Sequence, residues 1–311
     1  MAAASASVLA LVLALLKAAI DAVTDWRSEQ ILGAGDADLG ARLVQGAAGI
    51  APAVLGAALL VPPVLWLMRR APRSWPLAIG SLLAGLIVAA VWLPYALSAG
   101  PPMTPAPAGP VRDGLMRLIA DTGLPAHGVF FASDPNFDAD VTGGFGQAKV
   151  SVGPLIAAGP PAEARAFIGH IMGHYVHKDI LIVSLVLGAA MLLGCFAVSW
   201  LAAPLARRIG APAVVSSADP EALPAIAIVV ILTLAGAGLA EAGYLRWANV
   251  RADAYSLDHA REPDALISVI EREWDHRSVD PSPLEEALFY THPAMPGRIR
   301  HALAWKAAHG G

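Results

Sequence analysis

The chain has 311 residues, of which 56% are hydrophobic and only 15% are charged, and its net charge is −4. Soluble domains carry about 25% charged residues, so this composition indicates an integral membrane protein and argues against a soluble one. The slightly acidic balance provides no basic surface, and we therefore expect no nucleic-acid partner. The only cysteine, Cys195, lies in an apolar run and cannot form a disulfide within the chain.

Five segments are long and apolar enough to cross a bilayer, which takes about 20 residues of helix. They lie near residues 5–23, 44–68, 75–98, 180–203 and 221–243. The first segment has no basic start and no convincing cleavage site, so we interpret it as a membrane span and not as a signal peptide. Residues 1–98 would then hold three membrane helices, and the lipid bilayer is a partner of the chain.

The orientation follows from the two shortest loops, residues 68–74 and 205–211, which both carry arginines. The predicted spans place these loops on the same side of the membrane, and the positive-inside rule makes that side cytoplasmic. The polar segments 99–179 and 244–311 would then be extracytoplasmic, in what we expect to be a bacterial inner membrane. Basic residues also flank the spans on the other side, so the opposite orientation stays open.

Two polar parts, residues 111–179 and 244–311, are separated by the membrane segment 180–243. A connector rich in proline and small residues, 99–110, precedes the first part. The second part has apolar residues at helical spacing through most of its length. The expected fold class is therefore mainly α with a small β-sheet, in a polytopic helical membrane protein whose two polar parts come together as one α+β domain.

In the first polar part, the apolar spacing predicts a helix over 111–123 that ends at a glycine, and a short strand over 128–133. Residues 134–140 read as a polar loop rich in turn formers. Residues 147–153 alternate between apolar and polar, which is typical of a half-exposed strand. A helix with prolines at its entry follows, and we expect it to run on into the fourth span.

This last helix contains the sequence GHIMGHYVHKD, residues 169–179. His170 and His174 lie four residues apart and thus on one face of the helix, where both imidazoles can approach one metal ion. His177 lies two turns from His170, too far along a straight helix to join the same tetrahedral ion. The spacing is that of a zinc site, but it also arises by chance, so the histidines are either metal ligands or ordinary hydrogen-bonded side chains.

Longer motifs give the histidines a context. The sequences GFG…KVSV, AEARAFIGHxxGHYVHKD, RADAYSLDHAREPDAL and LFYTHPAMPGRI occur in this order, with two membrane spans between the second and the third. In these motifs the chain resembles the membrane gluzincin metallopeptidases, typified by the type I CAAX prenyl proteases and the HtpX-like proteases, which form metallopeptidase family forty-eight. The resemblance runs from about residue 111 to residue 309 and implies a zincin-like peptidase domain.

The resemblance implies roles for residues at matching positions. His170 and His174 stand where the family has its first two zinc ligands, and Asp253 stands where an aspartate supports a ligating histidine. His292 matches a histidine near the catalytic centre that contacts the oxyanion or the substrate, and Arg298 matches the arginine that follows it. The strand before the helix is an edge strand in that family, where it borders the cleft and pairs with extended substrate, so the resemblance implies an exposed edge over 147–153. The residues expected to contact substrate are Phe145, Gly146, Lys149, Val150, Ser151 and Arg298.

Two positions depart from the family pattern. The general base of the family is replaced by Ile171, which has no proton to give or take. The third zinc ligand, four residues before Asp253, is replaced by Asn249, whose neutral amide is a poor zinc ligand. Peptide hydrolysis needs three protein ligands, an open water position and a base, and loss of the base alone costs about 10²–10⁴ in rate. Zinc is therefore expected to be weakly bound or absent.

Two main hypotheses follow for the function. The first is a catalytically degenerate zinc-metallopeptidase homologue, a pseudoprotease that binds or regulates a peptide or a membrane-protein segment. The second is an active membrane zinc endopeptidase in which His177, Asp253 or His292 replaces the missing groups. Asp179 is discounted for this role because it lies on the far face of a continuous helix from His170. A purely structural membrane subunit is a third class.

Overall fold

The computed structural model of the chain describes residues 50–97, 103–144, 148–273 and 280–310, together with Val23, Trp26, Leu39, Gly40 and Leu43. Apart from Val23, the predicted first span lies outside the described residues, and so do Phe145 and Gly146. The chain divides into two units, residues 1–82 with 191–233 and residues 83–190 with 234–311. Each unit is considered by itself.

Three described helices are long and apolar enough to cross a membrane, and they coincide with the last three predicted spans. They are α4 (Trp75–Ala96), α8 (Asp179–Arg208) and α9 (Leu223–Ala260), the last preceded by the short 3₁₀ helix η1 (Pro220–Ala222). A further apolar helix, α3 (Ile50–Arg70), occupies the described part of the predicted span 44–68. These helices account for the low charge content, and the protein is a membrane protein.

The first unit is held at one end by a buried cluster that joins the two short basic loops. Met68 and Trp75 flank the loop after α3, and they pack with Ala202, in the last turns of α8, and with Ala218. The Arg69 guanidinium donates to the Ala218 carbonyl oxygen from Nε at 3.1 Å and from Nη2 at 2.9 Å. Both basic loops therefore lie at the same end of this unit; that this end is cytoplasmic stays a prediction.

The second unit contains a four-stranded sheet with the order β1-β2-β4-β3. Its strands are β1 (Met103–Pro105), β2 (Ala126–Ala132), β3 (Ala139–Thr142) and β4 (Ala148–Val152). β4 pairs with β2 in parallel and with β3 antiparallel, so the prediction of an exposed edge over 147–153 is wrong. The edge strands are β1 and β3, and β3 gives no strand signal in the sequence because it has only four residues and follows a run of turn formers.

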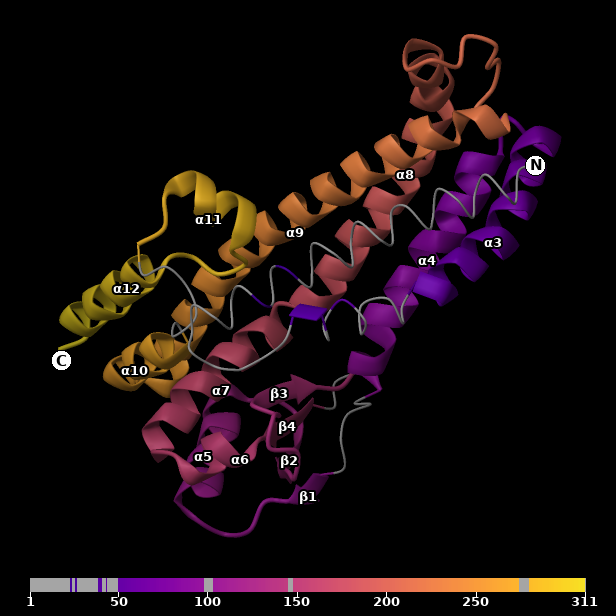
Figure 1. The fold of residues 1–311 in the computed structure, drawn as a ribbon. Helices are drawn as coiled ribbons and strands as arrows, with labels where there is room; N and C mark the ends of the chain where they lie inside the picture. The colour runs from indigo at the N-terminus through magenta and orange to yellow at the C-terminus, as the bar shows by residue number, and fades with distance from the viewer. Residues whose placement is uncertain are drawn as a thin grey trace. The chain divides into compact units, whose positions relative to one another are not determined.

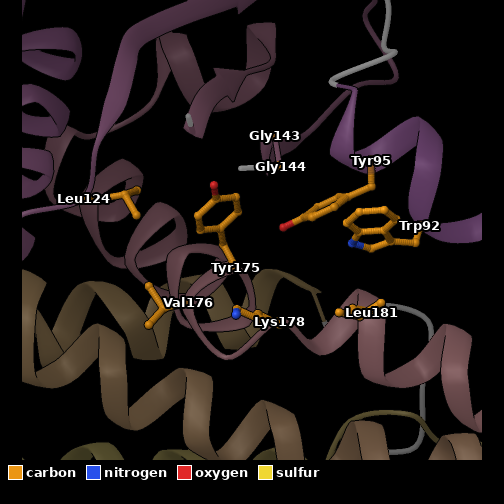
Figure 2. A pocket seen from close by; sticks show the side chains of 9 residues that line it. All are labelled: Trp92, Tyr95, Leu124, Gly143, Gly144, Tyr175, Val176, Lys178 and Leu181. Carbon is orange, nitrogen blue, oxygen red and sulfur yellow. The ribbon is translucent and has the colours of Figure 1, made fainter. Parts of the chain in front are cut away.

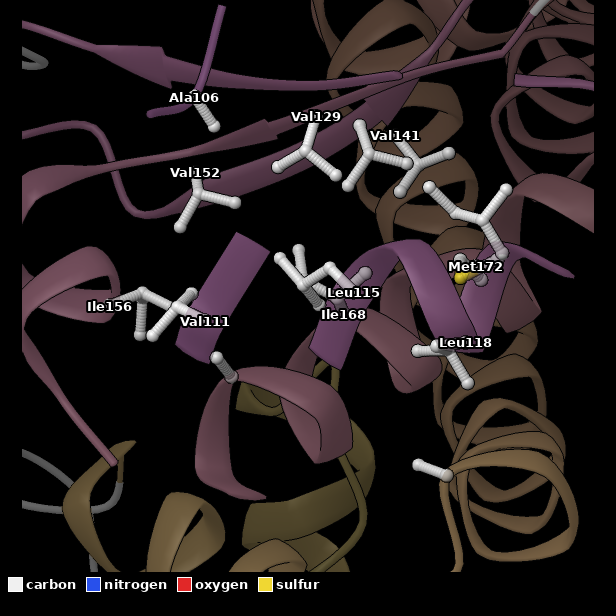
Figure 3. Close-up of a cluster of buried hydrophobic side chains, with 14 of the residues drawn as sticks. Ala106, Val111, Leu115, Leu118, Val129, Val141, Val152, Ile156, Ile168 and Met172 are labelled. Atoms are coloured by element: carbon white, nitrogen blue, oxygen red, sulfur yellow. The ribbon is translucent and has the colours of Figure 1, made fainter. Parts of the chain in front are cut away.

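Helices cover one face of this sheet (Figure 1). They are α5 (Pro110–Thr122), α6 (Pro154–Ala158) and α7 (Pro161–Val176). Figure 3 shows the valines of the strands facing aliphatic side chains of these helices. The predicted helix over 111–123 is confirmed as α5, and it ends at Gly123 in the left-handed conformation with φ 64°. The buried core includes Val129, Val141, Val150 and Val152 from the strands and Leu115, Leu118, Ile168 and Met172 from the helices.

The helix that carries the histidines does not continue into the fourth span, so that expectation is wrong. It ends at Val176, and Lys178 turns the chain with a left-handed φ of 58° before α8 begins at Asp179. His177 closes the helix end by donating from Nδ1 to the Gly173 carbonyl oxygen at 2.7 Å. The sequence has neither glycine nor proline at this turn, so no local pattern announced the break.

The helix α7 crosses α9 at a very short distance, because glycines face the contact. A Cβ atom on Gly173 would lie 2.8 Å from the Ala252 Cα atom, and one on Gly169 would lie 3.0 Å from the Ser256 hydroxyl oxygen. The Ser256 hydroxyl donates to the Ala166 carbonyl oxygen at 2.7 Å. This crossing packs the first polar part of the chain against the second.

Three more helices complete the second unit after α9. They are α10 (Pro263–Glu273), α11 (Pro283–Phe289) and α12 (Met295–Ala308). Ala166 of α7 shares a small buried cluster with Leu266 and Ile270 of α10 and with Ala302 of α12. The second polar part therefore packs on the helix that carries the histidines.

The close crossing predicts that Gly173→Ala lowers the free energy of unfolding by about 1–3 kcal/mol, because the added methyl group meets backbone that cannot give way. Gly297→Ala on α12 is the matched control, since a Cβ there would meet only the tip of Arg300 at 4.0 Å. Thermal unfolding in detergent micelles measures both changes. Equal effects of the two substitutions would contradict the crossing.

Candidate functional site

Two imidazoles face each other on α7. The Nε2 atoms of His170 and His174 lie 3.1 Å apart, and the two rings meet edge to face with centroids 4.8 Å apart. The opposite nitrogen of each ring contacts a carboxylate. His170 Nδ1 lies 2.7 Å from Asp253 Oδ1, and His174 Nδ1 lies 2.8 Å from Asp179 Oδ2. The spacing of four residues thus brings the predicted pair together.

Asp253 joins three helices at one buried point. It projects from α9, contacts His170 of α7, and accepts two hydrogen bonds from the Arg298 guanidinium of α12, from Nε at 2.7 Å and from Nη2 at 2.8 Å. All three side chains are buried. Burial lowers the pKa of His170 below its ordinary value, although the hydrogen bond to Asp253 opposes this. A neutral His170 donates from Nδ1–H to the carboxylate and keeps an unprotonated Nε2.

Arg298 therefore lies in a buried ion pair behind the histidines. Its guanidinium is turned to Asp253, and contact of Arg298 with substrate stays a prediction. A bidentate pair of this kind needs the fork geometry of arginine, because both carboxylate oxygens take part. Arg298 thus sets the orientation of Asp253 and, through it, of His170.

Asp179 has the corresponding place behind His174, and the sequence reasoning missed it. Its buried carboxylate accepts hydrogen bonds from the Tyr244 hydroxyl at 2.6 Å and from Arg251 Nη2, and it contacts His174. The interpretation as a continuous helix pointed Asp179 away from His170. The turn at Lys178 instead carries it back towards α7, and the sequence contains no signal for that turn.

The two carboxylates determine which nitrogen of each imidazole ring carries the proton. If each Nδ1–H donates to its carboxylate, both Nε2 atoms present lone pairs to each other at 3.1 Å. The two lone pairs repel each other unless the rings share a proton or a cation. Two nitrogens bound to one tetrahedral zinc ion at about 2.0–2.1 Å would lie about 3.3 Å apart, close to this separation.

The two positions that depart from the family pattern both make structural contacts in this protein. Ile171 is half-buried and packs against the core of the sheet and its helices. Asn249 is buried on α9, and its amide nitrogen donates to the Leu245 carbonyl oxygen at 2.8 Å and to the Thr291 carbonyl oxygen at 3.2 Å. Its Oδ1 atom is buried and has no hydrogen-bond partner among the described residues.

The segment with His292 is fastened to α9 through its backbone. Asn249 holds the Thr291 carbonyl, and Arg246 Nη1 donates to the Tyr290 carbonyl oxygen at 2.7 Å. His292 is half-buried, and its Nδ1 lies 3.2 Å from the Thr291 hydroxyl oxygen. The position of the predicted third ligand therefore serves to anchor the loop that carries the predicted downstream histidine.

Comparison with known proteins gives this arrangement a family. The family model of peptidase family M48 matches residues 105–306, more than half of the chain. The chain belongs to peptidase family M48. The fold is similar to the crystal structure of Ste24p from S. mikatae, with a TM-score of 0.56 and 17% sequence identity over 83% of this chain. The match covers 65% of the Ste24p chain, so this M48 protein spans less than two thirds of that length. No curated protein matches the sequence significantly.

The residues of this M48 site do not fit a catalytic zinc centre. Among the described residues, no three His, Cys, Asp or Glu side chains are grouped so that they could hold a metal ion. His170 and His174 supply two nitrogens, and the only further oxygen at the third position is the neutral Oδ1 of Asn249. At the base position, Ile171 cannot accept a proton. Two imidazoles can bind a metal ion weakly, but the charged ligand and the base of the family are both missing.

The strand residues predicted to contact substrate are in the interior of the sheet. Val150 and Ser151 are buried in β4, and Lys149 Nζ lies over the Phe130 ring, 5.1 Å from its centroid. Because β4 pairs on both sides, its backbone cannot add a further strand. Contact of Lys149, Val150 and Ser151 with a peptide stays a prediction.

A cavity lies at the end of the histidine helix, within the second unit (Figure 2). Its volume is about 530 Å³, and its lining is mainly aromatic and aliphatic, with Lys178 as the one charged residue. The amides of Gly143 and Gly144 close one side by donating to the carbonyl oxygens of Tyr95 and Ala96. The lining residues are Trp92, Tyr95, Leu124, Gly143, Gly144, Tyr175, Val176, Lys178 and Leu181.

Two tyrosine hydroxyls point into this cavity. Figure 2 shows the Tyr95 hydroxyl directed towards Tyr175, and the two ring centroids lie 6.2 Å apart. No described residue forms a hydrogen bond with either hydroxyl. Burial raises the pKa of Tyr175, so its hydroxyl stays a donor at physiological pH. An apolar cavity with a few converging donors has the usual composition of a ligand site.

The buried pair predicts that Arg298→Met lowers the free energy of unfolding by about 3–5 kcal/mol, because Asp253 would be left charged and buried with one partner fewer. Lys306→Met on the same helix is the control: its ion pair with Asp264 is exposed, and its loss should cost only about 0–1 kcal/mol. Chemical denaturation followed by circular dichroism measures both. Similar losses for the two variants would contradict the role given to Arg298.

Proposed function

We propose that this M48 protein is catalytically degenerate and acts by binding a peptide or a membrane-protein segment. The observation that carries the proposal is the use of Asn249, at the position of the third ligand, as a donor to two backbone carbonyl oxygens. A carboxylate could not make these hydrogen bonds, because it has no proton to donate. The residue is built into the packing of the loop and not into a metal site.

Ile171 supports the same proposal independently. The position of the general base faces the hydrophobic core, where an aliphatic side chain contributes to packing. The two positions lie on different helices and affect different steps, metal binding and proton transfer. A single replacement could be compensated locally, whereas two replacements in separate requirements favour a protein that no longer hydrolyses peptides.

The binding site that we propose is the cavity at the end of α7. Its lining includes Tyr175, the residue directly after His174, and it offers apolar walls for a side chain together with the hydroxyls of Tyr95 and Tyr175 for peptide carbonyl groups. Its volume of about 530 Å³ lies within the usual range of about 300–1,000 Å³ for ligand cavities. A segment bound there needs neither zinc nor a base.

The rival function is an active endopeptidase with substitute groups. It is favoured by the two Nε2 atoms that face each other at 3.1 Å and by the buried Oδ1 of Asn249, which could act as a neutral third ligand. Against it, the Ile171 side chain in the place of the general base cannot accept a proton. We propose a bacterial inner membrane as the location, with the polar parts on the extracytoplasmic side, from the basic loops at one end of the first unit.

The proposal predicts that the purified protein does not cleave a fluorogenic model membrane substrate above background with zinc added. The double variant Ile171→Glu with Asn249→Glu should gain zinc-dependent cleavage, because it restores the base and the charged ligand. The same variant with His174→Ala is the control and should be inactive. Cleavage by the wild-type protein that His170→Ala abolishes would refute the proposal in favour of the rival.

For binding, we predict that a photoreactive benzophenone amino acid at Leu124, in the cavity wall, crosslinks peptides from an apolar library under ultraviolet light. The same amino acid at Leu155, an exposed position on α6 that does not line the cavity, is the matched control. Mass spectrometry of the crosslinked products identifies the site. Crosslinks at both positions to the same extent, or at neither, would leave the cavity without a binding role.

A further inference from the structure

The short helix α11 exposes its apolar side chains and turns its acidic ones inward. Leu284 and Phe289 are 68% and 77% exposed, and Leu288 is 43% exposed. Glu285 and Glu286, the charged residues of the helix, are only half-exposed, and the Glu285 carboxylate accepts a hydrogen bond from the Tyr290 hydroxyl. A helix that faces water shows the reverse arrangement.

This helix is fastened to the membrane helix α9 at a defined height. Arg246 Nη1 donates to the Glu286 carbonyl oxygen at 3.1 Å and to the Tyr290 carbonyl oxygen at 2.7 Å, at the C-terminal end of α11. The carbonyl groups at the C-terminal end of a helix carry its negative dipole end, where a cation is favourable. These hydrogen bonds therefore hold α11 beside α9 at the level of Arg246.

The height of Arg246 corresponds to the surface of the bilayer. The uncharged stretch of α9 ends at Ala240, and Glu241 is the first charged residue after it. Six residues of helix separate Ala240 from Arg246, about 9 Å along the axis, and the headgroup layer on each side of a bilayer is about 5–8 Å thick, so Arg246 lies at the outer edge of that layer. Trp247 is 56% exposed and its ring contacts that of Tyr244, as in the aromatic belts of membrane proteins.

We propose that α11 is an interfacial helix that lies in the membrane surface and buries Leu284, Leu288 and Phe289 among the lipid chains near the headgroups. The occupant of this apolar surface is the phospholipid bilayer itself, because the surface is held next to the point where α9 leaves the membrane. Binding of a peptide partner or of a second copy of the chain would not require the surface to lie at the level of the membrane surface. The inference does not depend on the proposed function.

One consequence concerns the loop after the helix. Tyr290 and Thr291 follow α11 directly and are held by Arg246 and Asn249, so the same contacts fix His292 at a constant distance from the membrane surface. A polypeptide segment that reaches His292 at this distance from the membrane would therefore come from the bilayer and not from bulk solution.

Site-specific fluorescence in nanodiscs that hold one full-length chain tests the proposal. In a Cys195→Ala background, a single cysteine replaces Leu288 and carries an environment-sensitive NBD group, and a spin-labelled phosphatidylcholine serves as a quencher in the lipid. Leu303→Cys on α12 is the matched control, since Leu303 is 49% exposed, similar to Leu288. Arg298 and Trp305 hold α12 at Asp253 and Asp258. These positions lie 13 and 18 residues beyond Ala240, about 20–27 Å along α9 and outside the headgroup layer.

Quenching of the label at Leu288 should exceed that at Leu303 by at least about twofold, with blue-shifted emission, because only the first label lies within reach of the lipid quencher. Equal quenching at the two positions would overturn the proposal. So would a label at Leu288 that reports water in the nanodisc and is shielded only when a peptide is added or when a second copy of the chain is present.

Discussion

The pairing of the buried Asp253 carboxylate with His170 and Arg298 is the interaction on which the rest of the second unit depends. Asp253 lies on α9 and receives His170 from α7 and Arg298 from α12, so one side chain ties together three helices from distant parts of the sequence. A charge removed from water is costly unless its oxygens are fully paired. Here the pairing is complete only if all three helices are in place.

This interaction also gives the two histidines a structural role that is independent of hydrolysis. His170 is a hydrogen-bond partner of Asp253, and His174 has the same relation to Asp179, which in turn binds Tyr244 and Arg251. Loss of either histidine would leave a buried carboxylate short of a donor. Their presence therefore has a structural cause that does not require zinc. In the proposed function, Asn249 and Ile171 contribute to anchoring and packing in place of the chemistry of the family.

Much of the architecture could be predicted from the sequence, because its causes are local. Apolar length predicts the three membrane helices, and the terminal glycine of α5 predicts its left-handed end. The i, i+4 spacing of His170 and His174 brings them face to face, as expected for one side of a helix. The membership of the chain in peptidase family M48 agrees with the motifs in which the resemblance was found.

The errors share one physical reason, which is that the decisive features leave no recognisable pattern in the sequence. β4 is not an edge strand, because the four residues of β3, which follow a turn-rich sequence, pair with it. The turn at Lys178, without glycine or proline, places Asp179 behind His174. The amide of Asn249 finds its carbonyl on Thr291, which no spacing in the sequence connects to it.

The most direct test of the central claim is the zinc content of the wild-type protein. The full chain, purified with zinc in excess and then dialysed against a chelator of moderate affinity, is measured by mass spectrometry of its metals beside His170→Ala. Two imidazoles without a charged third ligand predict far less than one zinc ion per chain after dialysis. One zinc ion per chain, retained against the chelator and lost in His170→Ala, would contradict the account of a site that has kept its framework and lost its chemistry.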